Sequence, residues 1–359
     1  MKDIRPRIRR VLQGSDADFA LIMNTSYHDS NFTYLTGIYS GSFEGSVVIA
    51  EGESAKLITT QLDYGVAKDN PAKGLEVVCV NSRDEMLKNL KELKGKIVGI
   101  NGNFLPYGAY NRLKKDILPK KIIDISGRFI SARQVKEWDE IELIGIANNI
   151  VKKALSQIEG EFFSGMTEKE LAKTFDSMML DYGASSPSFE TIVCFGANSA
   201  VPHHVPDNTK LSNNSFVLID AGARYRGYCS DVTRTFIFKP EKKGSKYRKM
   251  LDIYNTVDAA QKAALERAVP DAYADTVHIA ASDYINKAKG GMYAGKFTHA
   301  LGHSVGIDVH DGPGFSPLSH YKLKERMVIS NEPGIYIDGF GGVRIEDDLL
   351  ILKKGSKYL

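Results

Sequence analysis

Cysteine, long hydrophobic runs and an excess of charge of one sign are all scarce in this sequence of 359 residues. Its three cysteines, Cys79, Cys194 and Cys229, are too few for a disulfide scaffold and favour a reducing compartment. No apolar run reaches the roughly 18 residues that a transmembrane helix needs. The N-terminal segment is basic, but the residues after it are too polar for a secretory signal. We therefore expect a cytoplasmic protein with no membrane partner.

Positive and negative charges nearly balance. Lys and Arg number 47 and Asp and Glu number 44, which leaves a net charge of +3. A balance this even argues against nucleic acid as a partner. Hydrophobic residues make up 43% and charged residues 25% of the chain, a composition that is typical of globular proteins and excludes disorder. The length predicts two domains.

The first domain is expected to span residues 1–126. Its short apolar runs predict β-strands at 19–23, 46–50, 57–59, 77–80 and 97–100. Helical patterning at 84–93 and at 107–117 falls between or after these strands. The alternation of the two kinds of element predicts a layered α/β domain.

The second domain is expected to span residues 127–359. Its periodicity predicts helices at about 136–159, after Thr167, at 244–268 and at 272–288. Thr167 and Glu170 form the capping box of the second of these. Strand-rich segments are expected at 191–195, 215–238, 297–310 and 326–352. A pair of helices followed by a hairpin thus occurs twice, which predicts an α+β domain with a curved antiparallel sheet.

The first predicted hairpin, residues 215–238, carries acidic residues where strands rarely have them. Antiparallel pairing about a turn just before Arg226 places Asp220 directly opposite Asp231. Like charges that face each other destabilise a hairpin unless a cation lies between them. This pair therefore indicates a cation site.

The second predicted hairpin repeats the arrangement near the C-terminus. A turn centred on Gly339 places Glu332 opposite Glu346. A single acid in a strand is most often solvent-exposed, but two hairpins that each present an opposed acidic pair favour a metal site.

Histidines supply further ligand chemistry. Six of the eight fall in or just after two groups: His203, His204, His299, His303, His310 and His320. The spacing of His299 and His303 resembles His-x-x-x-His, but the glutamate of the helical zinc motif is absent and the segment contains glycines, which disfavours a thermolysin-like site. Four carboxylates with one or two imidazoles suit Mn²⁺, Co²⁺, Zn²⁺ or Fe²⁺, and bridging carboxylates can hold two ions for hydrolysis.

These residues lie in the motifs IDAG, SDVTRT, LGHSVGIDVH, NEPGIY and VRIEDD, which resemble the metal-ligand motifs of the pita-bread metallopeptidases. That family includes methionine aminopeptidase, aminopeptidase P and prolidase. The segment NFTYLTGIYS at 31–40 resembles the creatinase-type N-terminal domain of the proline-specific branch. The resemblance implies a metal-dependent Xaa-Pro peptidase with a creatinase-like α/β N-terminal domain and a pita-bread catalytic domain. Creatinases share this architecture but lack the ligands.

The resemblance also implies a role for each site residue. The metal ligands would be Asp220, Asp231, His303, Glu332 and Glu346. They would hold two divalent ions, Mn²⁺ or Co²⁺, with Zn²⁺ and Fe²⁺ as alternatives. His203, His310 and Glu332 would be catalytic: Glu332 would accept the proton of the nucleophile, and the histidines would stabilise charge in the transition state. His299 would line the substrate pocket. Arg344, two residues before Glu346 and so on the same strand face, would either support the ligands or contact the substrate.

One departure leaves the substrate length open. Some prolidases carry an arginine four residues after the histidine that matches His310, where it holds the carboxylate of the substrate's proline. Gly314 occupies that position here. Dipeptides and longer proline-containing peptides therefore both remain expected substrates, and Arg344 or a cation from a partner subunit of a homodimer would have to replace the arginine.

Two other functions are weaker alternatives. A non-catalytic pita-bread protein that binds a macromolecular partner is disfavoured because the ligand set is complete and the sequence has no basic tails or insertions. Methionine aminopeptidase activity is disfavoured because most of those enzymes lack the extra N-terminal domain.

Overall fold

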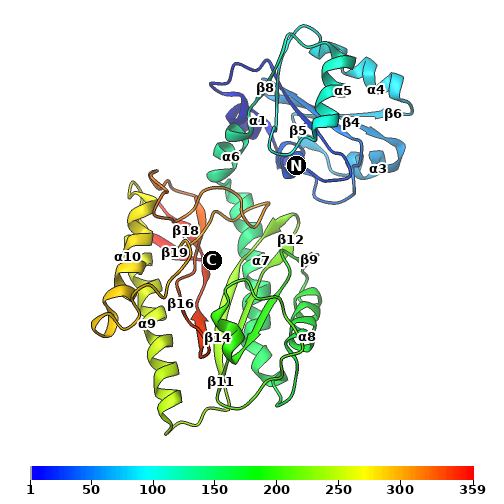
Figure 1. Ribbon diagram of the computed structural model, residues 1–359. Helices are drawn as coiled ribbons and strands as arrows, with labels where there is room; N and C mark the ends of the chain where they lie inside the picture. Colours follow the sequence, from blue (N-terminus) through cyan, green and yellow to red (C-terminus); the bar gives the residue numbers. More distant parts are fainter. Residues whose placement is uncertain (1) are drawn as a thin grey trace. The chain divides into compact units, whose positions relative to one another are not determined.

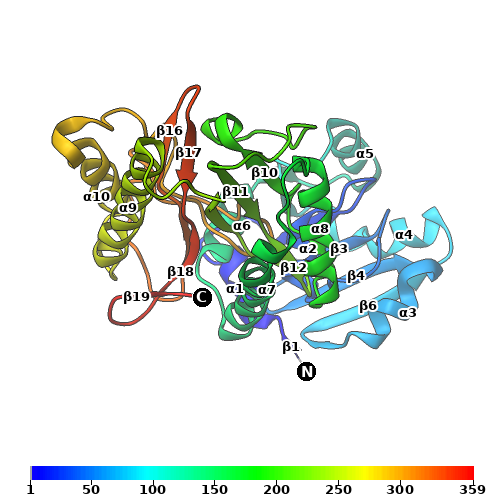
Figure 2. The same ribbon diagram turned by 90° about the horizontal axis from the view of Figure 1, so that it is seen from below.

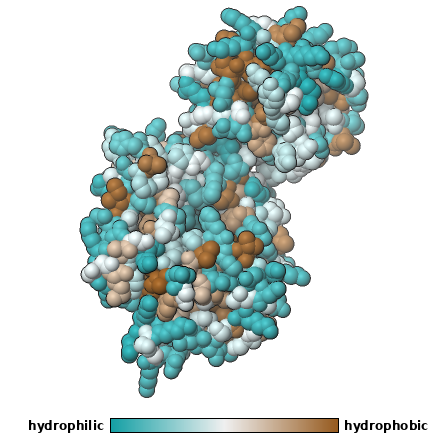
Figure 3. Space-filling view, in the orientation of Figure 1, coloured by the Kyte–Doolittle hydropathy of each residue, from teal (hydrophilic) through white to brown (hydrophobic). Residues whose placement is uncertain are grey.

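The computed structural model describes residues 2–359 of the chain. They divide into two compact units, one that ends at Arg133 and one that spans Gln134–Leu359. The division falls near the end of helix α6 (Ser126–Gln134), and the boundary expected after residue 126 falls at its beginning. Hydrophilic side chains cover most of the visible face of each unit (Figure 3). Among the described residues, no helix is both long and apolar enough to span a membrane.

The N-terminal unit is built on a six-stranded mixed sheet with the order β6-β4-β3-β2-β7-β8 (Figure 1). Its strands are β2 (Phe19–Met23), β3 (Val47–Glu51), β4 (Ser54–Thr60), β6 (Leu75–Val80), β7 (Ile97–Ile100) and β8 (Lys121–Asp124), and a separate pair consists of β1 (Lys2–Asp3) and β5 (Ala72–Lys73). Its helices before α6 are α1 (Arg5–Leu12), α2 (Ser30–Thr36), α3 (Gln61–Asp69), α4 (Arg83–Asn89), η1 (Lys91–Leu93) and α5 (Tyr107–Ile117). The predicted strands and the α/β class are confirmed.

The C-terminal unit combines two helix pairs with small antiparallel sheets. Its helices are α7 (Trp138–Gln157), η2 (Ile158–Glu161), α8 (Glu168–Asp181), η3 (Gly196–Ala200), α9 (Ser245–Arg267), α10 (Ala274–Lys287) and η4 (Ala288–Gly291). Its strands are β9 (Ser186–Pro187), β10 (Ile192–Phe195), β11 (Ser215–Ala221), β12 (Ala223–Tyr225), β13 (Tyr228–Cys229), β14 (Val232–Phe238), β15 (Val328–Asn331), β16 (Gly334–Ile337), β17 (Gly341–Arg344), β18 (Asp347–Ile351) and β19 (Ser356–Tyr358). The four predicted long helices and the capping box at Thr167 are confirmed.

Each helix pair packs on its own strands, so the unit has two cores. One core joins α7 and α8 to β10, β11 and β14, and the other joins α9 and α10 to the strands of the C-terminal hairpin. Figures 1 and 2 show the two pairs on opposite sides of the strands that lie between them. The recurring order of helix pair and hairpin predicted from the sequence is therefore present, and the two hairpins meet between the cores.

The register of the first hairpin differs from the prediction by two residues. Asp220 pairs with Thr233 rather than with Asp231. The turn lies at Arg226 and Gly227, whose φ angles are 46° and 80°, as a two-residue hairpin turn of type I′ requires. Because side chains alternate with a period of two, a shift of two keeps Asp220 and Asp231 on one face as diagonal neighbours.

The register of the second hairpin is as predicted. Asn331 pairs with Asp347 on one side of the acidic pair, and Gly334 pairs with Arg344 on the other. Both ladders belong to one continuous register, in which Glu332 stands opposite Glu346. Gly339 lies in the turn with a φ of 68°.

The prediction of a strand-rich segment at 297–310 is wrong. Within the described residues it contains no strand beyond the isolated bridge between Ser304 and Ile329. The segment is a loop that lies beside β15, where the Ser330 N–H donates to the His303 carbonyl over 2.8 Å. Gly302 packs directly on this partner, because a Cβ there would lie 1.9 Å from the Ser330 carbonyl oxygen. The glycine therefore permits a close approach of two backbones rather than a regular ladder.

Candidate metal centre

The five predicted metal ligands line one cavity of about 660 Å³ in the C-terminal unit. Asp220 lies in β11, and Asp231 lies between β13 and β14. His303 lies in the loop formed by residues 297–312. Glu332 directly follows β15, and Glu346 lies between β17 and β18. Elements separated by more than a hundred residues therefore contribute to one site.

Ligand atoms in this set lie close enough to share a cation. One ligand atom each of Asp231, His303 and Glu346 lies within 4.8 Å of the other two. The His303 Nε2 atom is 3.4 Å from an oxygen of Asp231 and 3.5 Å from an oxygen of Glu332. His303 Nδ1 is 3.0 Å from the carbonyl oxygen of Val309, which can only accept a hydrogen bond. The proton therefore belongs on Nδ1, and Nε2 presents a lone pair to the carboxylates, as a metal-binding histidine does.

The carboxylates are buried with too little positive charge around them. Burial, with Glu346 and Asp220 close by, raises the pKa of Asp231 well above its usual range, and burial together with Glu332 does the same to the pKa of Glu346. Asp220 Oδ1 and Glu346 Oε1 are buried without a hydrogen-bond partner. Unpartnered oxygens on buried acids are costly. The residues fit hard divalent cations that would bind these oxygens.

A hydrogen-bonded chain supports Asp220. The Arg344 guanidinium donates through Nη2 to Asp220 over 2.7 Å and through Nη1 to the Tyr336 hydroxyl over 3.1 Å. The Tyr336 hydroxyl is 2.8 Å from His299 Nε2. Arg344 and His299 both line the cavity, and Arg344 is committed to Asp220. The sequence analysis missed Tyr336, although it stands in the NEPGIY motif.

Two further residues position the ligands. The Thr233 hydroxyl donates to Glu346 over 2.6 Å and accepts from Arg344 Nε over 3.1 Å, so it connects the two hairpins. Asp348 accepts the backbone N–H of Asp231 and the side-chain amide of Asn148, over 3.1 and 2.8 Å. Thr233 lies within SDVTRT and Asp348 within VRIEDD, but their contacts depend on the pairing of distant segments.

The other histidines of the two groups separate into two environments. His203 and His310 line the cavity, and the His310 ring packs edge-on against His303 with ring centroids 4.0 Å apart. His204 instead lies 2.7 Å from the buried carboxylate of Glu168. The His320 side chain is 73% exposed and lies beside Asp275.

Gly314, which replaces the expected arginine, is closely packed. A Cβ at this position would lie 2.1 Å from the carbonyl oxygen of Gly302 and 2.2 Å from the Cα atom of His303. No side chain can occupy that position without moving the backbone that carries His303. The glycine therefore belongs to the packing of the ligand loop and leaves no open space beside it.

A second group of potential ligands consists of Glu168, His204 and Asp207. The Glu168 carboxylate accepts hydrogen bonds from the backbone N–H groups of Phe195 and Asp207, over 2.7 and 3.0 Å, and from the Asn198 amide over 3.0 Å. With His204 as well, its oxygens are fully used by the protein. The group therefore holds the loop that carries His203 rather than a cation.

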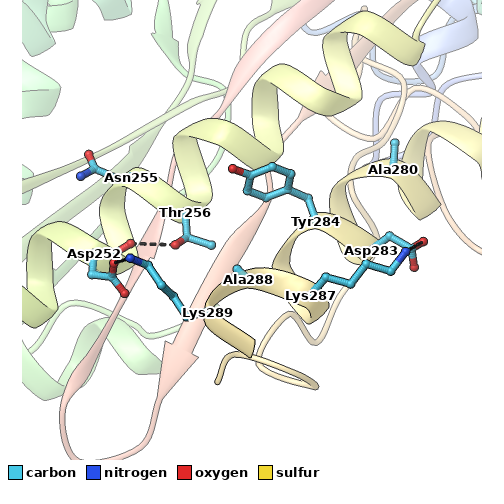
Figure 4. A pocket seen from close by; sticks show the side chains of 9 residues that line it. All are labelled: Asp252, Asn255, Thr256, Ala280, Asp283, Tyr284, Lys287, Ala288 and Lys289. Atoms are coloured by element: carbon cyan, nitrogen blue, oxygen red, sulfur yellow. Dashed lines mark hydrogen bonds and ion pairs between the residues drawn. The ribbon is translucent and has the colours of Figure 1, made fainter. Parts of the chain in front are cut away.

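A second cavity, of about 640 Å³, lies between α9 and α10 (Figure 4). Its charges neutralise one another: Lys289 pairs with Asp252 over 2.8 Å, and Lys287 pairs with Asp283 over 2.7 Å. It contains none of the predicted site residues. The chemistry of the described chain is therefore concentrated in the first cavity.

Comparison with known proteins agrees with this site. A model of metallopeptidase family M24 matches residues 142–353, and a model of the creatinase/prolidase N-terminal domain matches residues 5–135. The chain is 37% identical over 329 residues to an Xaa-Pro dipeptidase of Pyrococcus horikoshii, which covers 92% of this chain and 90% of that protein.

Solved structures give the same result. The prolidase from Pyrococcus horikoshii has a TM-score of 0.86 at 35% identity, with 98% of this chain and 97% of that chain covered. The X-Pro aminopeptidase from Thermotoga maritima has a TM-score of 0.88 at 29% identity, with 97% of each chain covered. With both domains matched, the chain belongs to metallopeptidase family M24 and is a metal-dependent hydrolase that carries a creatinase/prolidase N-terminal domain.

Proposed function

We propose that this protein hydrolyses the bond between an N-terminal residue and a following proline, with two divalent cations as its cofactor and Mn²⁺ or Co²⁺ as the natural choices. The observation that carries the proposal is the convergence of carboxylates from both hairpins on His303 Nε2 in a single cavity. Relatives named Xaa-Pro dipeptidase, prolidase and X-Pro aminopeptidase support the proline requirement.

The cavity suits a substrate that is apolar at one end. Five apolar residues contribute to its lining: Phe189, Ile192, Pro202, Ala300 and Val309. A proline ring has no N–H group to satisfy once it forms part of a peptide bond, so an apolar wall can bury it at little cost. The carboxylates, which form the polar part of the lining, would hold the cations and the N-terminal amine.

Asp220, Asp231, His303, Glu332 and Glu346 would hold the divalent cations, which would supply a water molecule of lowered pKa and polarise the scissile carbonyl. Glu332 is suited to hold the proton that the water loses. Its Oε1 accepts from the Ser330 hydroxyl over 3.0 Å, which leaves Oε2 without a hydrogen-bond partner among the described residues. His203 and His310 line the same cavity and would donate hydrogen bonds to the oxygen that gains charge in the transition state.

The experiment that tests the proposal compares peptides with and without proline. Chelator-treated protein reloaded with Mn²⁺ should cleave Ala-Pro or Ala-Pro-Ala and leave Ala-Ala and Ala-Ala-Ala intact. Chelator-treated protein that is not reloaded with Mn²⁺ should be inactive, because its carboxylates then lack their cations. Equal cleavage of Ala-Ala, or full activity in the presence of chelator, would contradict the proposal.

Substitution Glu332→Gln tests the proton acceptor. We expect a loss of about 10²-fold or more in kcat, since an amide cannot take up the proton. Metal content is measured in parallel, because Glu332 is also a proposed ligand. Retention of more than about a tenth of the activity with the metal still bound would exclude Glu332 from this role.

We also propose that the protein acts as a homodimer, which the family resemblance implies, and that it does so in the cytoplasm, which the scarcity of cysteine favours. Light scattering during size-exclusion chromatography would give the mass of the assembly directly, and a monomer mass would contradict the dimer.

A further inference from the structure

The cavity of the candidate metal centre is lined by one arginine side chain that none of its carboxylates neutralises. Two arginines line the cavity, Arg224 and Arg344. Arg344 is 3% exposed at its side chain and is paired with Asp220 over 2.7 Å. Arg224 forms no ion pair within 4.0 Å with any carboxylate of the described residues, although Asp308 lines the same cavity.

Two carbonyl groups hold the Arg224 side chain in place. Arg224 lies in β12, where it pairs with Cys229 of β13. Its Nη1 atom donates to the carbonyl oxygens of Ile307 and Gly227, over 2.9 and 3.3 Å. Nε and Nη2 have no acceptor among the described residues, and neither atom is a buried unsatisfied group. A guanidinium with one edge anchored and other donors accessible is arranged for a planar, doubly accepting anion such as a carboxylate.

The anchoring carbonyl also places Arg224 near the reacting groups. Ile307 precedes Asp308, Val309 and His310, all of which line the cavity. Arg224 therefore lies on the wall that continues into His310. By contrast, the position of Gly314 has no room for any side chain, because a Cβ there would meet the backbone of Gly302.

We propose that Arg224 binds the free C-terminal carboxylate of the substrate and makes the protein selective for Xaa-Pro dipeptides. This inference rests on the proposed Xaa-Pro peptidase function. In a dipeptide, the carboxylate belongs to the proline itself, next to the bond that is cleaved. In a longer peptide, an amide replaces this charge, and Arg224 loses its ionic partner.

The test measures how the effect of Arg224 depends on the substrate carboxylate. The substrates are Ala-Pro and its C-terminal amide, and the variants are Arg224→Gln and Arg224→Lys, all loaded with Mn²⁺. For Arg224→Gln we expect KM for Ala-Pro to rise about tenfold to one-hundredfold, the range for a lost hydrogen bond to a charged group, with kcat changed little. Kinetics on the amide should change less than about twofold. Arg224→Lys should lie between, since it keeps the charge and loses the fork of donors.

Arg226→Gln is the matched control. Arg226 is exposed, lies two residues along in the same hairpin and does not line the cavity. It should leave the kinetics on both substrates unchanged. If the wild-type protein cleaves the amide too slowly, its inhibition constant against Ala-Pro hydrolysis replaces KM.

Each contrary result has a distinct meaning. An equal loss on Ala-Pro and on the amide would show that Arg224 only holds the Ile307 segment, and unchanged kinetics on both would show that it does not bind substrate. Either result overturns the inference and leaves the proposed function standing. If the wild-type protein binds Mn²⁺ and cleaves neither compound, the proposed function fails and the inference fails with it. Metal content and thermal midpoint, measured for each variant, identify a misfolded protein, in which case Arg224→Lys decides.

Discussion

The two hairpins that supply the carboxylates interrupt their ladders in different ways. In the first, β11 ends at Ala221 and β14 begins at Val232, and between them the chain passes through Gly222 into a separate small sheet. Asp220 remains within the ladder and Asp231 lies in the interruption. In the second, Glu332 and Glu346 both lie in the interruption and face each other.

The difference shows that a carboxylate can face the site from within a ladder, as Asp220 does, or from an interruption of one, as the other three do. Pro333 has no N–H to give to the second ladder. Gly222 lies at the interruption of the first ladder and packs against the facing segment, since a Cβ there would lie 2.0 Å from the Ser230 carbonyl oxygen.

The largest expected effect comes from removing one ligand from each hairpin. We expect Asp231→Asn and Glu346→Gln each to weaken Mn²⁺ binding by more than about 100-fold, beyond the loss typical of residues that only support a ligand, and to abolish hydrolysis. Isothermal titration calorimetry measures the first and peptide cleavage the second. Asp338→Asn, at an exposed position in the turn of the second hairpin, is the control and should behave as wild type. Wild-type binding by either ligand variant would mean that one hairpin suffices.

The next effect tests the contact between the hairpins. Thr233→Val keeps the shape of the side chain but leaves Glu346 Oε2 and Arg344 Nε without their shared partner. Mn²⁺ affinity should fall by about 10- to 100-fold. Thr235→Val is the comparison, because Thr235 bonds only to the backbone of Arg344, over 2.9 and 3.2 Å. Equal losses of affinity in the two variants would show that the hairpins are not coupled through Thr233.

A smaller effect compares the stability contributed by Gly222, at the first interruption, with that of Gly339, in the turn of the second hairpin. Gly222→Ala forces a Cβ into the Ser188 hydroxyl and the Ser230 carbonyl, each 2.0 Å away, and should lower the free energy of unfolding by about 1–3 kcal/mol or more. Gly339→Ala meets no atom within 4 Å, and its positive φ of 68° should cost about 1 kcal/mol. Urea unfolding monitored by circular dichroism compares the two. A larger loss for Gly339→Ala would contradict the close packing at Gly222.

The smallest expected effect lies outside both hairpins and depends on pH. His278 Nδ1 accepts the Leu301 N–H over 3.2 Å, and burial lowers the pKa of His278 below the usual histidine value of about 6.5. The unfolded chain therefore takes up this proton first as the pH falls, so the contribution of His278 to stability is present above pH 6.5 and is lost as the pH drops through the lower folded pKa.

His278→Gln removes this titration and keeps an acceptor for Leu301. The thermal midpoint of the wild-type protein should therefore fall more than that of the variant between pH 7.5 and pH 5. Parallel midpoints over that range would exclude His278 as a source of the acid sensitivity.

Sequence reasoning succeeded where local rules determine the structure. The capping box of Thr167 and Glu170 and the 3.6-residue periodicity after it predict α8, and Gly339 marks the turn that defines the second register. It failed at the first turn, where Arg226 adopts a positive φ that is uncommon for an arginine. Without an Asn-Gly or Asp-Gly signal, the centre of the hairpin was placed one residue too early, and the register moved by two.

The sequence by itself predicted the long helices, the strands of the N-terminal unit and the five candidate ligands, because these follow from periodicity, capping and recognisable motifs. Only the tertiary structure decided which arginine side chains in the cavity are neutralised by a carboxylate. Arg344 and Arg224 look alike in the sequence, yet one is locked to Asp220 and the other keeps accessible donors in the cavity. That difference arises because β11, β12, the 297–312 loop and β17 come together only in the folded unit, and the charge on a side chain has no partner until its neighbours are in place.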